Sequence, residues 1–109
     1  SHKLIGYVPD LVISPSLDYA QEILPDWPAS FSVSSALGQV EAARSGAGIA
    51  ILHTFIARMH PELVPVPAAP PIRRSYWLGY HESVRTLRRI QAVTNFIADE
   101  VNAMRASFV

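Results

Sequence analysis

The sequence predicts an α/β domain with a mostly parallel sheet, flanking helices and a long C-terminal helix. An apolar run rich in β-forming residues, 4–8, ends at the turn-forming pair Pro9 and Asp10. Between residues 31 and 52, a strand, a helix and a second strand follow one another with short turns, which is the pattern of a parallel sheet. A single apolar stripe then runs along the segment that begins at Ser83.

The composition bounds what the chain can be. Its 109 residues form one small domain at most, and its 50% of hydrophobic residues can build a core, which excludes a disordered tail. Nine basic residues balance nine acidic ones, so no whole-chain field attracts nucleic acid. The longest apolar run, 49–52, is far shorter than the roughly 20 residues that span a membrane. With no cysteine and no signal-peptide pattern, we expect a cytoplasmic protein that contacts no membrane.

A short helix is expected after the first strand. Ser14 offers a capping hydroxyl before Pro15, which suits the first helical turn, and Pro25 stops the helix after about two turns. Its apolar residues recur at helical spacing and are Leu17, Ala20, Ile23 and Leu24.

The central unit has clearer signals. Residues 31–33 alternate like a strand, and Ser34 or Ser35 can cap the helix that follows. Gly46 and Gly48 end that helix, because glycine adopts a left-handed conformation without steric cost. Residues 49–52 are then predicted to form a fully buried strand. The apolar face of the helix comprises Leu37, Val40, Ala43 and Ala47.

The remaining elements lie in the second half. We expect a short helix over 54–60, an edge strand over 63–66 and another strand over 73–80. Four of the nine prolines fall between residues 65 and 71 and stiffen that loop. The last helix opens at Ser83, runs for about seven turns and needs a partner surface for its apolar stripe. The stripe comprises Leu87, Ile90, Thr94, Ile97, Val101, Met104 and Phe108.

Three arginines, Arg85, Arg88 and Arg89, crowd the expected start of this helix. The helix dipole disfavours positive charge there, and Arg85 and Arg89 form a repulsive pair one turn apart. Carboxylates on a partner would compensate this charge; the alternative is a solvated basic face screened by salt.

The best candidate for a binding site is the pair Ser34 and Ser35. Where a strand feeds a helix at the carboxyl end of a parallel sheet, free backbone N–H groups and hydroxyls converge and can hold a small anion. The alternative is that one serine only caps the helix.

Other chemistry is weaker in this sequence. His53 closes the buried strand and could donate to a ligand or sense pH, or be a plain surface histidine. The four histidines have no metal-like spacing, and Gly46 and Gly48 come after a helix, the reverse of the order in nucleotide-binding loops. No nucleophile elbow or paired catalytic carboxylates occur, so neither a cofactor nor an enzymatic activity is expected.

The order and spacing of several segments resemble the second half of the effector-binding region of LysR-type transcriptional regulators. These segments are Leu4-Ile5-Gly6-Tyr7, the run Ser-Gly-Ala-Gly-Ile-Ala-Ile-Leu at 45–52, Pro61-Glu62-Leu63-Val64, and Trp77-Leu78 with His81. The resemblance implies half of a periplasmic-binding-protein-like (type II) domain, in which a small metabolite binds between two α/β lobes. A winged helix-turn-helix precedes these lobes in the family.

The resemblance also divides the chain. Residues 1–80 would form the second lobe, with 4–8 and 76–80 as the two crossover strands, and 81–109 a helix that packs on a first lobe. It implies effector contacts at Ser34, Ser35, His53 and Thr54, although many relatives carry proline at position 53. The helix over 16–24 resembles one that contributes to the dimer of these domains, through Leu17, Ala20, Gln21 and Leu24.

The function that the sequence predicts is therefore the sensing of a small, anionic effector by a bacterial transcription regulator. The regulator would be a homo-oligomer, a dimer or tetramer, and would contact DNA through the helix-turn-helix alone. Because the chain begins at Ser1 and enters a strand almost at once, we expect it to be a piece of a larger protein. The alternatives are a lobe of a transport-type solute-binding protein and a fragment of an α/β enzyme.

Overall fold

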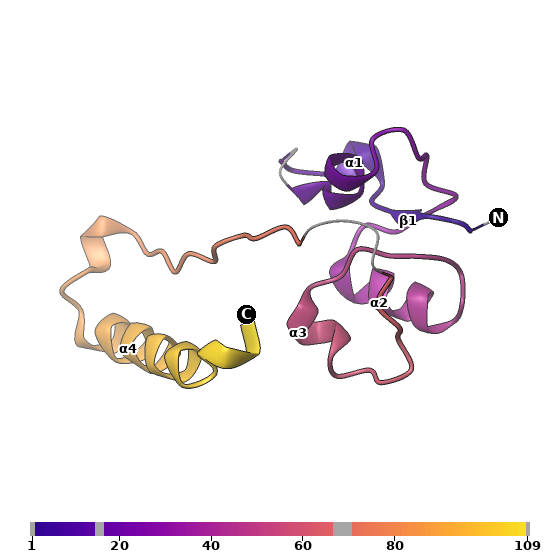
Figure 1. The fold of residues 1–109 in the computed structure, drawn as a ribbon. Coiled ribbons are helices and arrows are strands. Elements are labelled where there is room, and N and C mark those ends of the chain that lie inside the picture. The colour runs from indigo at the N-terminus through magenta and orange to yellow at the C-terminus, as the bar shows by residue number, and fades with distance from the viewer. Residues whose placement is uncertain (1, 15–16, 67–70, 109) are drawn as a thin grey trace. The chain divides into compact units, whose positions relative to one another are not determined.

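The structure is a computed structural model that describes residues 2–14, 17–66 and 71–108. The chain divides into two compact units, Ser1–Ile72 (unit 1) and Arg73–Val109 (unit 2) (Figure 1). Unit 1 contains the sheet, and unit 2 contains the long C-terminal helix.

The sheet of unit 1 is parallel, as predicted. Strand β1 (Ile5–Gly6) pairs with β2 (Phe31–Ser32), with Ile5 opposite Phe31. On the other side of β1, Leu4 forms a parallel bridge to Ile49. The N–H of Ile5 donates to the Ile49 carbonyl at 2.8 Å, and the N–H of Ile49 donates to the Lys3 carbonyl at 2.8 Å. The first strand of the chain is therefore the middle one.

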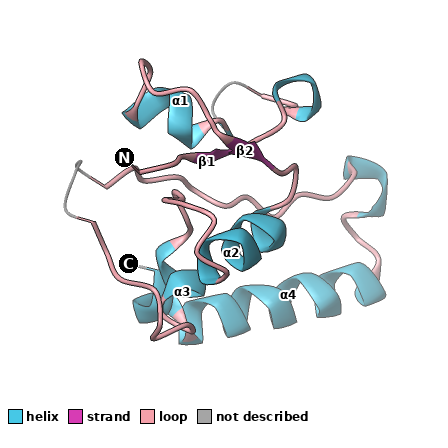
Figure 2. Cartoon of the chain, turned by 90° about the vertical axis from the view of Figure 1, so that its right-hand side faces the viewer, coloured by secondary structure: helices cyan, strands magenta, loops and turns pink. Residues whose placement is uncertain are grey.

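Helices cover both faces of this sheet. Helix α1 (Tyr19–Ile23) lies on one face, and α2 (Ala36–Arg44) and α3 (Thr54–Ala57) lie on the other (Figures 1 and 2). A single turn of 3-10 helix, Pro9–Leu11, follows β1. The core sits between these layers and comprises the buried apolar side chains of Leu4, Ile5, Ala20, Val40 and Ala42. The expected α/β class with flanking helices is thus present in unit 1.

Helix α1 begins later than the sequence predicts. Its cap is Asp18, whose carboxylate accepts a hydrogen bond from the Gln21 N–H at 3.3 Å. Ser14 instead contributes its carbonyl oxygen, which accepts from the Leu17 N–H at 2.9 Å. The predicted first-turn residues Pro15 and Ser16 lie outside the described residues. The expected helix end before Pro25 is confirmed, since α1 stops at Ile23.

Ser35 is the cap of α2. Its Oγ accepts from the Gly38 N–H at 2.9 Å, which decides between the two predicted serines. At the other end Gly46 has a φ of 81°, the left-handed value that the sequence predicts. The N–H groups of Gly46 and Ala47 donate to the carbonyls of Ala43 and Ala42, each at 3.0 Å, so the helix ends in a Schellman motif.

Gly48 has a different role from the one predicted. It is not in the left-handed region, and a Cβ added there would lie 2.5 Å from the Lys3 carbonyl oxygen. Glycine is needed because the backbone of β1 approaches so closely, and helix termination requires only Gly46.

The predicted buried face of α2 is partly wrong. Val40 is buried, but Leu37 is 70% exposed, and the other buried residues are Gln39 and Ala42. The buried part of α2 is therefore its middle, residues 39–42, and its first turn is more exposed.

Three predicted strands are absent or reduced. In the segment 49–52 only Ile49 pairs, and its residues are half-buried rather than fully buried. Segments 63–66 and 73–80 form no strand, and Val64 is 81% exposed. A strand needs a neighbour that accepts and donates its backbone hydrogen bonds. Neither segment has such a neighbour in the described part of the chain.

The helical part of unit 2 is one long helix with a short helical turn before it and another after it. A 3-10 turn, Glu82–Val84, precedes α4 (Arg88–Ala103), and a second one, Arg105–Phe108, follows it. The helix predicted to open at Ser83 therefore begins at Arg88. His81 caps the first turn, where its Nδ1 accepts from the Ser83 N–H at 3.1 Å.

The apolar stripe of α4 is present, and most of it is exposed. Ile90 and Thr94 are half-buried, whereas Ile97 is 38%, Val101 48% and Met104 53% exposed. No residue of the described part of unit 2 is buried. This exposure agrees with the predicted need for a partner surface, which stays a prediction.

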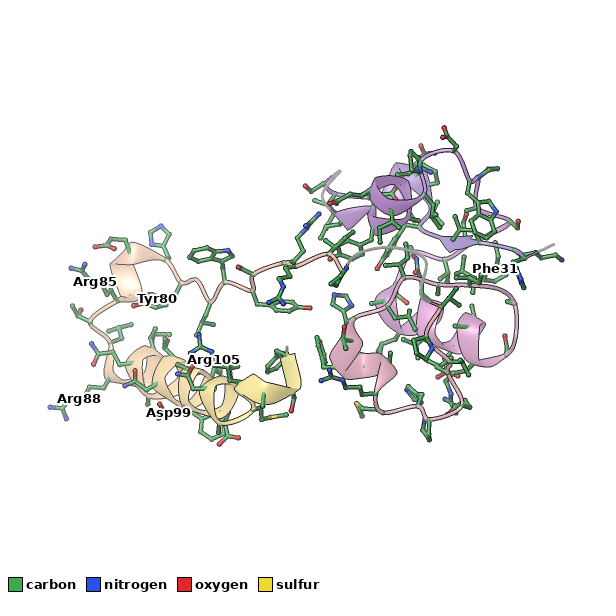
Figure 3. All side chains as sticks on the ribbon, viewed as in Figure 1. Phe31, Tyr80, Arg85, Arg88, Asp99 and Arg105 are labelled. Carbon is green, nitrogen blue, oxygen red and sulfur yellow. The ribbon has the colours of Figure 1, made fainter. Side chains whose placement is uncertain are left out.

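The predicted repulsion between Arg85 and Arg89 is wrong. Arg85 lies before α4, outside any helix shared with Arg89, and its Nη1 is 3.2 Å from Oε1 of Glu82. Figure 3 places Arg85 beside the 3-10 turn and Arg88 at the beginning of α4, with both side chains pointing away from the helix. The carboxylate that compensates the charge of Arg85 is therefore that of Glu82, three residues earlier in the chain.

Candidate functional site

The carboxyl edge of the sheet brings the predicted effector residues to one side of unit 1. Ser34 and Ser35 follow β2, and His53 and Thr54 follow the segment that pairs with β1 through Ile49. Since all three chain segments run parallel, their carboxyl ends share an edge, which is where ligands of α/β sheets bind.

The first turn of α2 offers hydrogen-bond donors at this edge. Ser35 uses its Oγ as the cap, and the Gln39 N–H donates to the Ser35 carbonyl at 3.0 Å. The N–H groups of Ala36 and Leu37 have no acceptor in the described part of the chain, as expected for the first turn of a helix. The neighbouring Ser34 is exposed. A hydroxyl and two free N–H groups at the positive end of a nine-residue helix suit a small anion.

Gln39 is a buried polar residue that the sequence analysis missed. It is 2% exposed, and within the described ranges its Nε2 has no hydrogen-bond partner. Gln39 lies one turn after Ser35 on the same side of α2, and helical side chains lean toward the N-terminus. No local signal in the sequence points to it, because the helical spacing favours Leu37 as the buried position.

His53 is packed among aromatic rings. It is the N-cap of α3, and its carbonyl accepts from the N–H groups of Ile56 and Ala57, each at 3.0 Å. Its half-buried ring lies 5.9 Å from the Tyr19 ring at 90° and 5.6 Å from the Phe55 ring at 54°, measured between centroids. Both separations fall in the range of favourable aromatic pairs. Thr54, the first residue of α3, is exposed.

The residues predicted for a dimer contact do not all lie at the surface. Ala20 is 6% exposed and belongs to the core of unit 1. Leu17 is 44% exposed, Gln21 is exposed and Leu24 is half-buried. A contact through α1 therefore has Leu17, Gln21 and Leu24 available.

A separate charged cluster lies at the opposite end of α2. Arg44 contacts Glu41, with Nη1 2.8 Å from Oε1, and its Nε donates to Glu62. Hydrogen bonds to Glu62 and Glu41 raise the pKa of Arg44. The pKa of Glu62 is lowered, first by a hydrogen bond from the Glu62 backbone N–H and then by the hydrogen bond from Arg44. These contacts join α2 to the turn at 60–62 and lie away from the carboxyl edge.

The described residues contain neither a cluster of candidate metal ligands nor a membrane-spanning helix. Within residues 2–14, 17–66 and 71–108, no group of three or more His, Asp or Glu side chains could hold a metal ion. None of the helices in these same ranges is long and apolar enough to cross a membrane.

Comparison with known families decides the relationship of the chain. The family model of the LysR substrate binding domain matches residues 1–102. The chain belongs to this family. No curated protein and no solved structure matches it. A LysR substrate binding domain has a periplasmic-binding-protein-like fold, with which the parallel sheet and flanking helices of unit 1 agree. The prediction of an effector-binding fragment of a LysR-family regulator is thus confirmed at the level of the family.

Proposed function

We propose that this chain senses a small anionic metabolite for a LysR-family transcription regulator. Ser34 and Ser35 contact the anion, and His53 and Thr54 form the neighbouring part of the site. The effector binds between this lobe and a first lobe, and closure of the lobes changes the geometry of an oligomer on DNA. Such a change requires that the effector bind the closed state more tightly than the open one.

The observation that carries this proposal is the first turn of α2. Its two N–H groups that find no acceptor among the described residues, with the exposed Ser34 beside them, lie at the carboxyl edge of a parallel sheet. Each buried hydrogen bond to an ionised group contributes about 1.5–3 kcal/mol. Two or three such bonds account for binding of a small carboxylate in a cleft.

Other features support the rest of the assembly. Membership in a regulator family favours this function over a transport receptor or an enzyme. The exposed stripe of α4 supports the assignment of 81–109 to a helix that packs on a first lobe. The exposed residues of α1 support a homo-oligomer contact there, and DNA contact belongs to a helix-turn-helix outside these 109 residues. A cytoplasmic location is part of the same proposal.

Two substitutions separate binding from capping. Ser34→Ala removes a hydroxyl that does not cap the helix, and should weaken binding of small carboxylates by about 1 kcal/mol or more. Ser35→Asp keeps a capping oxygen but places a negative charge at the site, so it should abolish binding while leaving α2 folded. Amide chemical shifts of residues 36–38 during titration with a panel of small carboxylates measure both effects.

Ser45→Ala is the matched control. Ser45 lies at the opposite end of α2, where its Oγ donates to the Ala42 carbonyl at 2.8 Å. It should cost stability and leave binding unchanged. Unchanged affinity in both Ser34→Ala and Ser35→Asp would remove these serines from the site.

A further inference from the structure

The ring of His53 contacts the ring of Tyr19, which belongs to a helix on the other face of the sheet. His53 begins α3, and Tyr19 is the first residue of α1. These helices lie on opposite faces of the sheet (Figures 1 and 2). Their two rings meet edge to face, with centroids 5.9 Å apart. The Phe55 ring packs on His53 from within α3, at 5.6 Å. The first turns of α1 and α3 are therefore joined by side chains.

Both rings lie where the backbone is hydrogen-bonded into the first turn of a helix. The His53 carbonyl accepts two hydrogen bonds from α3. Asp18, next to Tyr19, accepts from the Gln21 N–H through its side chain and from the Glu22 N–H through its carbonyl. A shift of the α3 start therefore moves the His53 ring, and this ring bears on the first turn of α1.

We propose that His53 is a positioning residue that couples the carboxyl edge of the sheet to α1. An anion held at that edge changes the packing of α1, whose exposed Gln21, with Leu17 just before the helix, is offered to a second copy. The anion in this statement rests on the proposed function, whereas the coupling rests on the ring contacts alone. His53 thus acts through Tyr19, and need not itself touch the effector.

Amide hydrogen exchange of the 109-residue chain tests the coupling without any ligand. The reporters are the Glu22 and Leu24 amides of α1, and the references are the Gln39 and Ser45 amides of α2. Loss of one aromatic pair in His53→Ala should speed exchange of the α1 amides about three- to tenfold, with α2 changing less than about twofold. His53→Phe keeps a ring and should restore slow exchange.

A second arm uses sulfate as the anionic probe. In the unaltered chain, sulfate should shift the amides of residues 36–38 and those of α1 with one saturation curve. In His53→Ala, once enough sulfate has been added to saturate the shifts at 36–38, those of α1 should still be absent. A residue that only stabilised the fold would not remove the α1 response selectively, and His53→Phe should recover it.

The outcomes separate the two proposals. If His53→Ala changes the exchange rates of the α1 and α2 amides by the same factor, the coupling is overturned, regardless of the response to sulfate. An α1 response to sulfate that survives this substitution also overturns it. No sulfate response at 36–38, together with faster α1 exchange in His53→Ala, would sink the anion site at Ser34 and Ser35 while supporting the coupling.

Discussion

Units 1 and 2 differ in how much of their apolar surface they bury. Unit 1 buries Leu4 and Ile5 almost completely, at 0% and 1% exposure, between helices on both faces of a small sheet. Unit 2 has a longer and more regular helix, yet Phe96 of α4 remains 65% exposed. Regular secondary structure therefore does not by itself make a core. The apolar stripe of α4 requires a surface that the described residues of its own unit do not supply.

The largest expected effect on stability comes from replacing an isoleucine with alanine, once in each unit. Ile5→Ala should lower the free energy of unfolding by about 2–5 kcal/mol, because it opens a cavity in a closed core. Ile97→Ala in α4 should change it by less than about 0.5 kcal/mol, because Ile97 is 38% exposed and alanine favours helices. Urea unfolding of both variants checks this. Equal losses would mean that unit 2 has a core of its own.

A pair of glycines sharpens the same contrast. Gly48→Ala should destabilise the chain by about 1–3 kcal/mol, because the new Cβ would meet the Lys3 carbonyl oxygen and push β1 away. Gly79→Ala in unit 2 meets nothing within 4 Å and should be neutral. Thermal unfolding measures both. A neutral Gly48→Ala would contradict the close pairing of β1 with the segment at Ile49.

The substitution Gln39→Met tests the role of the buried Nε2 donor of Gln39 in unit 1. Because Nε2 has no acceptor in the described part of the chain, replacing it with an apolar side chain of similar size should stabilise unit 1 by about 1 kcal/mol. Denaturant unfolding gives the sign. A clear loss of stability would instead reveal a partner for this amide, such as a bound water.

The smallest effect concerns the surface ion pair of Arg44 and Glu62. The Glu62 backbone N–H and the Arg44 guanidinium hold the pKa of Glu62 below its ordinary value of 4.5. Since the folded pKa is the lower one, this contribution is present above the unfolded pKa and is lost as pH falls through the folded pKa. The difference in unfolding midpoint between the unaltered chain and Glu62→Gln should therefore shrink below about pH 4.5. A difference that grows on acidification would contradict the assignment.

Features that depend on a few neighbouring residues were predictable. A serine cap at 34 or 35, Gly46 as a left-handed stop and Pro25 as a barrier each follow from local backbone chemistry, and the structure contains all three. The parallel direction of the sheet was also predictable from strands joined by helices, but the sequence did not say that β1 pairs with β2. The site at Ser34 and Ser35 was proposed from the same local pattern and stays a prediction, and the family match agrees with the overall assignment.

Features that depend on distant residues were not predictable. Segments 63–66 and 73–80 have the composition of strands, but a strand exists only beside a neighbour, and sequence spacing does not supply one. The contact between Tyr19 and His53 joins residues far apart in the chain, so no local pattern reveals it. Gln39 was missed because periodicity placed Leu37 on the buried face, whereas the buried residues of α2 are Gln39, Val40 and Ala42.

The central position of β1 has a consequence for the order in which the protein is made. The partners of β1 on its two sides, residues 31 and 32 and residue 49, are all translated after it. During synthesis, one edge of β1 can pair once β2 has emerged, but its other edge stays unpaired until residue 49, more than forty residues later, has emerged. The sheet is complete only when the segment at Ile49 arrives.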